Sequence, residues 1–334
     1  MTTTRINTVT GAITPDQLGT TLMHEHIVIG YPGWESDTLH PGPSRNECLA
    51  IAVDRIQQMQ DHGINSMLDP CPSDLGRDVE LAAEVASRTG FNIVCATGFY
   101  KEDQGGKPYW ALYHEMGQAA ERMAEVMIHE FDHGISGTGI KPGVIKVGSG
   151  VGRITDYEYG ILKAASIAHK ETGLPVTTHT DQGTMGIEQQ QYLVENGVPA
   201  HMIIIGHSCG NPDVAYHQAI AGAGSYVGFD RFGLDILAPD SVRIDNLVRM
   251  IEGGWNERLV VSHDCVFCAR GVPFPEALVG AADLDVLFNP THFHRHIIPQ
   301  LKSRGITGEQ LDMLLIENPR RYFSGAPLSP VHGG

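Results

Sequence analysis

The chain has 334 residues, of which 42% are apolar and 19% charged, a composition typical of a globular protein that can bury a substantial core. The formal net charge of −16 argues against nucleic acid or an anionic membrane surface as a partner, because both attract basic surfaces. The first residues lack the apolar core of a secretory signal, and no later stretch reaches the ~18 apolar residues of a membrane span, so we expect a cytoplasmic protein that acts on small molecules.

Short apolar segments alternate with longer amphipathic ones along the whole chain. Alternating strands and helices predict a parallel sheet. Eight such units favour a closed (β/α)8 TIM barrel, formed by residues 1–334 as a single domain, over an open doubly wound sheet. The expected strands are 21–30, 65–70, 92–100, 143–150, 174–180, 201–208, 225–231 and 258–264.

The first expected strand contains two histidines, His24 and His26, separated by Glu25. Residues i and i+2 of a strand point to the same face, so the two imidazoles would lie side by side and could chelate a metal ion. A pair of hydrogen-bonded core histidines is the alternative for an isolated motif of this kind. The remaining strands decide between the two interpretations.

Four later strands carry a titratable side chain near their carboxyl ends: Lys146, His179, His207 and Asp264. In a TIM barrel these ends meet at one face, where active sites are built. Imidazoles and a carboxylate suit zinc or a similar divalent ion. A buried lysine is readily deprotonated, and a neutral amine can add carbon dioxide to give a carbamate able to bridge two metals. A barrel lysine paired with a carboxylate is the alternative for Lys146.

Four motifs accompany these residues: LGTTLMHEH at 18–26, GFDRFGLD at 228–235, SHD at 262–264 and ENPRRYF at 317–323. Together with the histidines, the lysine and the aspartate, they resemble the phosphotriesterase family of the amidohydrolase superfamily, and within it the phosphotriesterase-like lactonases. The resemblance spans about residues 8–323. It implies a metal-dependent hydrolase of ester bonds that forms a homodimer.

The resemblance also implies roles for the six residues. His24, His26 and Asp264 would hold one divalent ion, His179 and His207 the other, and Lys146, carboxylated by carbon dioxide, would bridge them. Zinc is the expected metal, with iron, cobalt and manganese as alternatives. Asp264 would also accept a proton and pass it to the leaving group. No nucleophile motif such as G-x-S-x-G competes with this mechanism.

The ligands alone do not select among a lactone, a phosphotriester and a carboxylester. The resemblance implies that Tyr100 and Arg231 contact the substrate, as an aromatic residue and an arginine do in the family's lactonases. We therefore expect a lactonase acting on lactones with an apolar tail, such as N-acyl-homoserine lactones, with promiscuous phosphotriesterase activity. An organophosphate or carboxylester hydrolase is the alternative, and a barrel that binds metal or ligand without turnover is an alternative of another class.

Two long connections are expected, 101–111 and 265–291. The second would either line a channel for the tail or cap the barrel. Its apolar residues are Val266, Phe267, Val272, Phe274, Leu278, Leu284, Leu287 and Phe288.

Other polar residues near these positions are not expected to bind metal. Glu25, His201 and His263 are expected to support or pack, and Cys265 and Cys268 form an incidental C-x-x-C, because no second one completes a zinc ribbon. His292, His294 and His296 belong to the last long connection or its helix and are likewise excluded.

Overall fold

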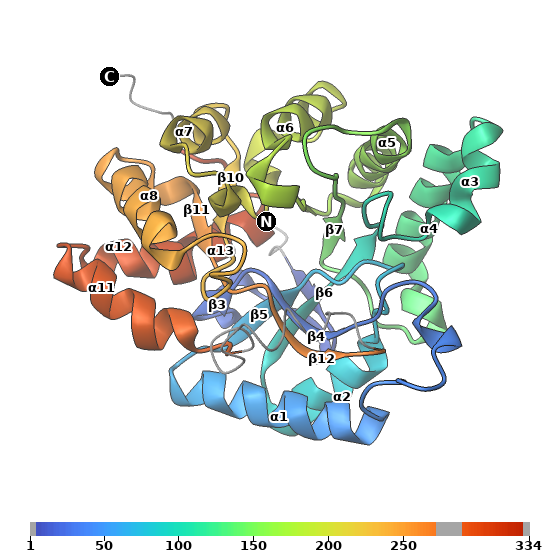
Figure 1. Ribbon diagram of the computed structural model, residues 1–334, viewed down its shortest axis with the longest axis horizontal. Coiled ribbons are helices and arrows are strands. Elements are labelled where there is room, and N and C mark those ends of the chain that lie inside the picture. Colours follow the sequence, from blue (N-terminus) through green and yellow to red (C-terminus); the bar gives the residue numbers. More distant parts are fainter. Residues whose placement is uncertain (1–4, 272–288, 330–334) are drawn as a thin grey trace.

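The computed structural model describes residues 5–271 and 289–329, and it confirms the (β/α)8 barrel (Figure 1). Eight strands pair in parallel in the order β3-β5-β6-β7-β8-β9-β10-β11, after a short hairpin of β1 (Ile6–Thr8) and β2 (Gly11–Ile13). Each lies within one of the expected strands but is shorter. The barrel strands are β3 (Thr21–Leu22), β5 (Ser66–Asp69), β6 (Asn92–Gly98), β7 (Val144–Lys146), β8 (Val176–Thr177), β9 (Ile203–Ile205), β10 (Tyr226–Phe229) and β11 (Leu259–Val261).

The expectation of one continuous strand over 21–30 is wrong. The segment breaks after β3, and β4 (Glu25–Ile29) leaves the barrel to pair in parallel with β12 (Cys265–Ala269). Two backbone hydrogen bonds, from Met23 N to Val261 O at 3.3 Å and from Asp264 N to His24 O at 3.0 Å, span the seam between the first and last barrel strands. The connection expected after β11 therefore begins with a strand, β12, which lies outside the eight-stranded sheet and pairs with β4.

Helices follow the strands and surround the barrel (Figure 1). The first begins at a capping box, because the Ser44 hydroxyl accepts a hydrogen bond from Glu47 N and the Glu47 carboxylate accepts one from Ser44 N. Among the described residues no helix is long and apolar enough to cross a membrane. The helices are α1 (Arg45–Asp61), α2 (Val79–Thr89), α3 (Lys107–Glu115), α4 (Ala119–His133), α5 (Asp156–Thr172), α6 (Gly186–Glu195), α7 (Val214–Gly222), α8 (Asp240–Glu252), α11 (Ile298–Ser303), α12 (Gly308–Asp312) and α13 (Asn318–Ser324).

Alternation along the strands separates two apolar layers. Residues such as Ile145 and Met67 belong to the large cluster beneath the helices, whereas their neighbours Val144 and Leu68 belong to a smaller cluster inside the barrel. Because Lys146 lies two residues after Val144, its side chain points inward above this filled interior. The members of the interior cluster include Leu68, Val94, Ala96, Val144, Ile204, Tyr226, Val260, Tyr322 and Phe323.

Candidate metal centre and substrate pocket

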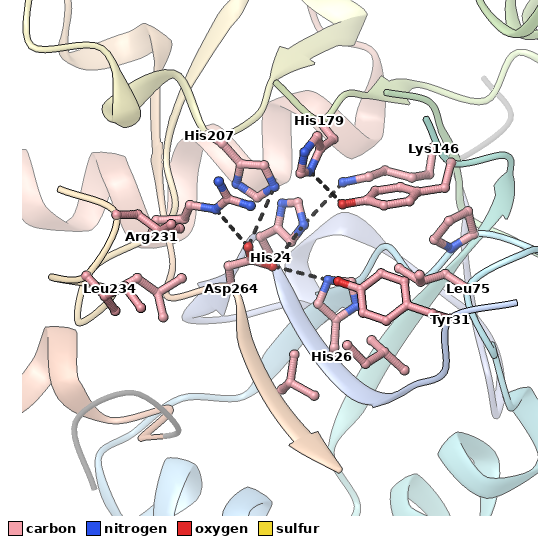
Figure 2. A pocket seen from close by; sticks show the side chains of 16 residues that line it. His24, His26, Tyr31, Leu75, Lys146, His179, His207, Arg231, Leu234 and Asp264 are labelled. Carbon is pink, nitrogen blue, oxygen red and sulfur yellow. Dashed lines mark hydrogen bonds and ion pairs between the residues drawn. The ribbon is translucent and has the colours of Figure 1, made fainter. Parts of the chain in front are cut away.

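All six predicted ligands converge at the carboxyl ends of the barrel strands (Figure 2). The Oδ1 atom of Asp264 lies 3.6 Å from His24 Nε2 and 3.2 Å from His26 Nε2, while its Oδ2 lies 3.7 Å from His207 Nε2. The Lys146 ammonium nitrogen lies 3.2 Å from His24 Nε2. The His179 ring completes the group, with its centroid 4.6 Å from that of His207. Residues separated by up to 240 positions along the chain thus share one small volume.

Buried carboxylates face the outer nitrogens of three of the histidines. Asp230 lies 3.3 Å from His24 Nδ1 and 3.0 Å from His207 Nδ1, and Asp69 lies 3.4 Å from His26 Nδ1. A carboxylate beyond the ring is the usual companion of a metal-binding histidine, because it fixes the ring and leaves the other nitrogen as a donor. These three histidines therefore present Nε2 to the centre.

His179 has the opposite orientation. Its Nε2 lies 2.7 Å from Asp181 Oδ1, and its Nδ1 faces the cavity, 3.3 Å from the hydroxyl of Tyr100. The three supporting aspartates, Asp69, Asp230 and Asp181, were not among the predicted site residues. The rule that selected the ligands, a charged residue ending an apolar strand, would also have selected Asp69 and Asp230.

The backbone at two of the predicted ligands is strained. His207 and Asp264 both have φ of 57°, in the left-handed region that side chains other than glycine rarely occupy. Each lies two or three residues beyond the end of its barrel strand, Ile205 for His207 and Val261 for Asp264, where the chain leaves the sheet. Such conformations persist when the surrounding structure enforces them, and they gather at functional sites.

Burial sets the protonation of the nitrogen donors. The pKa of Lys146 is lowered to about 8, because its ammonium is buried, although Asp264 and Asp230 partly oppose the shift. Burial also lowers the pKa of His179 to about 3 and that of His207 well below its usual value. The lysine amine is thus easier to deprotonate than usual, and both histidines are neutral near pH 7.

His26 and Asp264 behave as an ion pair. Burial opposes charge on both, but hydrogen bonds with Asp264 and Asp69 raise the pKa of His26 well above its usual value. The imidazole and guanidinium groups around Asp264, those of His207 and Arg231 first, hold the pKa of its carboxyl well below the usual range. An ionised carboxylate surrounded by imidazoles with inward nitrogens is a donor set that suits a divalent cation, whose binding would displace the proton of His26.

A cavity with about 850 Å³ of space, measured out to its open mouth, lies directly over this centre. Tyr100 and Arg231 both line it, and the Nε of Arg231 donates a 2.9 Å hydrogen bond to Asp264 Oδ2. The structure thus places both residues at the site, where contact with a substrate stays a prediction. The remaining wall is mostly apolar: Ile29, Tyr31, Pro72, Leu75, Leu234, Ile236, Leu237 and Val266.

This wall differs from the expected one. Of the apolar residues assigned to the connection after β11, Val266 lines the cavity, whereas Phe267 is buried in the core, because alternation along β12 turns it away. The other six, Val272, Phe274, Leu278, Leu284, Leu287 and Phe288, lie outside the described residues. The connection after β10, from which only Arg231 was predicted to contribute, also supplies Leu234, Ile236 and Leu237.

Among the residues that were not expected to bind metal, Glu25, His263 and His292 have hydrogen-bonding partners outside the six predicted ligands. The Glu25 carboxylate accepts hydrogen bonds from the Ser262 hydroxyl, from the backbone of His263 and Cys265, and from His263 Nδ1. It therefore fixes the segment on either side of Asp264. His292 pairs with Asp240, His201 and His294 are half-buried, His296 is exposed, and Cys265 and Cys268 are buried free thiols.

Replacing Glu25 by glutamine should lower the free energy of unfolding by about 1–3 kcal/mol, because the amide cannot accept all four hydrogen bonds and leaves buried donors unsatisfied. Urea unfolding measures the change. Glu121→Gln, at a half-exposed ion pair with Lys163, is the control and should stay within about 0.5 kcal/mol of the wild type. Equal stability of the two variants would contradict the role assigned to Glu25.

The barrel, the converging ligands and the cavity above them define a metal-dependent hydrolase. The model of the phosphotriesterase family matches residues 4–323, so the chain belongs to that family. Members of the family are metal-dependent hydrolases of ester and phosphoester bonds that use two divalent ions, and the protein is an enzyme of this class.

Individual relatives agree with this assignment. The chain is 36% identical to a phosphotriesterase homology protein of Mycobacterium tuberculosis, covering 95% of this chain and 97% of the relative. It is 31% identical to an aryldialkylphosphatase of Saccharolobus solfataricus, covering 94% and 97%. The solved organophosphorus hydrolase of Deinococcus radiodurans is 38% identical, with a TM-score of 0.91 over 96% of this chain and 97% of that one.

Proposed function

We propose that the six converging residues hold two divalent metal ions. His24, His26 and Asp264 would hold one ion and His179 and His207 the other, with the carbamate of Lys146 between them. Zinc fits the imidazole-rich donor set, as iron, cobalt or manganese also would. The inward nitrogens and the carboxylates behind the rings support this proposal. When bound, the ions would supply water activation and polarisation of the oxygen under attack.

The protein's own side chains would transfer the proton, orient the substrate and exclude water. Asp264, with its oxygens facing three imidazoles and Arg231, is placed to accept a proton from the attacking water and deliver it to the leaving group. The hydroxyl of Tyr100 and the guanidinium of Arg231, both on the cavity wall, would orient the substrate's polar group. The apolar wall would exclude bulk water.

We further propose that the substrate is a lactone with an apolar tail, such as an N-acyl-homoserine lactone. The observation that carries this proposal is the apolar wall beside the centre, where Ile236 and Leu237 remain 43% and 55% exposed although they are large and apolar. A tail lying against these side chains would bury surface that otherwise contacts water.

Organophosphate hydrolysis is the second candidate, and the relatives favour it. Two are named an aryldialkylphosphatase and an organophosphorus hydrolase. A further solved structure, 38% identical with a TM-score of 0.90, comes from the engineering of organophosphate hydrolysis from a weak promiscuous lactonase template. The same centre can attack either electrophile, so relative rates decide between the two candidates.

Rates on lactones of graded tail length test the substrate assignment. Each added methylene should raise kcat/KM by up to about fourfold, equivalent to ~0.8 kcal/mol, until the apolar wall ends. Leu237→Ala should flatten this dependence, whereas Ile51→Ala, on the outer helix α1, should not. A flat response in the wild type, with a phosphotriester preferred over every lactone, would reject the lactonase and favour the second candidate.

The homodimer expected from the resemblance also stays a proposal. The large side chains of Tyr109 and Leu112 on α3, and of Met116 directly after it, are more than half exposed and would suit such a contact. Sedimentation velocity at micromolar concentration measures the state directly, and a monomer there would contradict the proposal.

A further inference from the structure

The ring of His179 is contacted on both sides, by Tyr100 on one side and on the other by Asp181, which Lys101 holds in turn. The hydroxyl of Tyr100 lies 3.3 Å from His179 Nδ1, on the cavity side. On the other side Asp181 Oδ1 lies 2.7 Å from Nε2, and the ammonium of Lys101 lies 2.5 Å from the second oxygen of the same carboxylate. Lys101, Asp181 and His179 thus form a chain of contacts that ends at a predicted metal ligand.

Lys101 is unusual because its side chain is only 4% exposed. A buried ammonium is costly unless a negative group compensates it, and Asp181 does so at a short distance. Its other carboxylate neighbour, Asp103 at 3.2 Å, is 65% exposed, so water screens that contact. The buried charge of Lys101 is therefore directed mainly at Asp181.

The backbone at Lys101 and the backbone at Asp181 are both held by hydrogen bonds. Tyr100 N donates to Asp74 Oδ1, and Gly105 N donates to the carbonyl of Lys101. The carbonyl of Asp181 accepts hydrogen bonds from both the backbone and the hydroxyl of Thr184. The contacts thus join two separately anchored segments, which is the arrangement expected of groups that hold a ring rather than of a surface ion pair.

We propose that Lys101 and Asp181 are positioning residues that set the affinity of the His179 side of the centre for its metal ion. Asp181 holds Nε2–H, which leaves Nδ1 as the donor, and Lys101 holds Asp181. The proposal rests on the proposed function, because it requires that His179 bind a metal ion. It predicts that loss of either residue weakens one of the two ions selectively.

Zinc titration of metal-free protein against a competing chromophoric chelator tests this, with Lys101→Met, Lys101→Arg, Asp181→Asn and the double variant. Lys101→Met and Asp181→Asn should each weaken one ion by about 10- to 100-fold and leave the other unchanged. Lys101→Arg should restore most of the affinity, because it keeps the charge. The double variant should lose no more than Asp181→Asn alone, because Lys101 acts through Asp181.

Two controls make the result specific. Lys163→Met removes a half-exposed lysine from its ion pair with Glu121 and should change neither affinity. In a His179→Ala background, which should keep one ion, Lys101→Met should have no further effect, because the ligand that it positions is gone. An additional loss in that background would overturn the proposal.

The outcomes separate the inference from the proposed function. A wild type that binds fewer than two zinc ions would overturn both. Two ions bound, with unchanged or equally weakened affinities in Lys101→Met and Asp181→Asn, would overturn the positioning role alone. If Lys101→Met does not fold, as judged by circular dichroism, Asp181→Asn carries the same test, because it preserves the shape of the carboxylate.

Discussion

Lys146→Ala should lose most of its bound metal and at least about 100-fold in kcat/KM, more than the loss typical of a group that only supports a ligand. The physical reason is that the variant removes the lysine that, among the described residues, lines the cavity and that we propose to carry the bridging carbamate, and it leaves a gap above the apolar interior. Metal content measured by mass spectrometry, together with activity on one fixed substrate, gives both quantities.

Chemical rescue distinguishes the bridge from a structural role. A short carboxylic acid added to Lys146→Ala should occupy the gap and restore part of both metal binding and activity, because its two oxygens resemble those of a carbamate. Reconstitution of the metal-free wild type at a fixed concentration of dissolved carbon dioxide should be faster above pH 8 than at pH 6, because carbon dioxide adds to the neutral amine, whose fraction rises with pH through its pKa of about 8. A fully active Lys146→Ala variant would show that the lysine is not needed for metal binding or catalysis.

The fold was predictable because its signal is repeated. Each repeating unit consists of a short apolar strand and an amphipathic segment that follows it. Eight such units identify a barrel even when the boundaries of individual strands are wrong. The predicted boundaries of the first strand, 21–30, were wrong, because hydrophobic periodicity does not show where a strand leaves the barrel. Leu22 ends β3, His24 turns into the centre, and β4 pairs with β12, a strand that forms only because the chain after Asp264 runs outward.

The convergence of the six residues was predictable because a titratable group is costly at the end of a buried strand, so Lys146 or His207 stands out against its apolar neighbours. The supporting groups were harder. Asp181 and Lys101 do not interrupt a strand, and their importance lies in a contact across 80 positions of sequence. The apolar wall at Ile236 and Leu237 was missed for a similar reason, because solvent-exposed apolar side chains in a connection have no pattern until the cavity beside them is known.

Asp264→Asn should retain much of its metal and yet lose about 10³- to 10⁴-fold in kcat on an unactivated lactone. Asparagine keeps the shape of the side chain and one oxygen able to face His24 and His26, but it cannot accept a proton. Loss of a general base typically costs 10² to 10⁴-fold, and the upper part of this range is expected because the carboxylate also balances the charge of the centre.

The size of this loss should depend on the leaving group. The alkoxide released from a lactone is a strong base and needs the proton that Asp264 would deliver, whereas a nitrophenolate leaves without one, so an activated ester should suffer less. With its single oxygen toward His24 and His26, the asparagine loses the hydrogen bond from Arg231 Nε, but this loss is common to both substrates, so the difference between them still reports proton transfer. Both substrates should be measured on the same preparation, with its bound metal quantified. Equal losses on the two, or a loss that follows metal content alone, would mean that Asp264 serves only as a ligand.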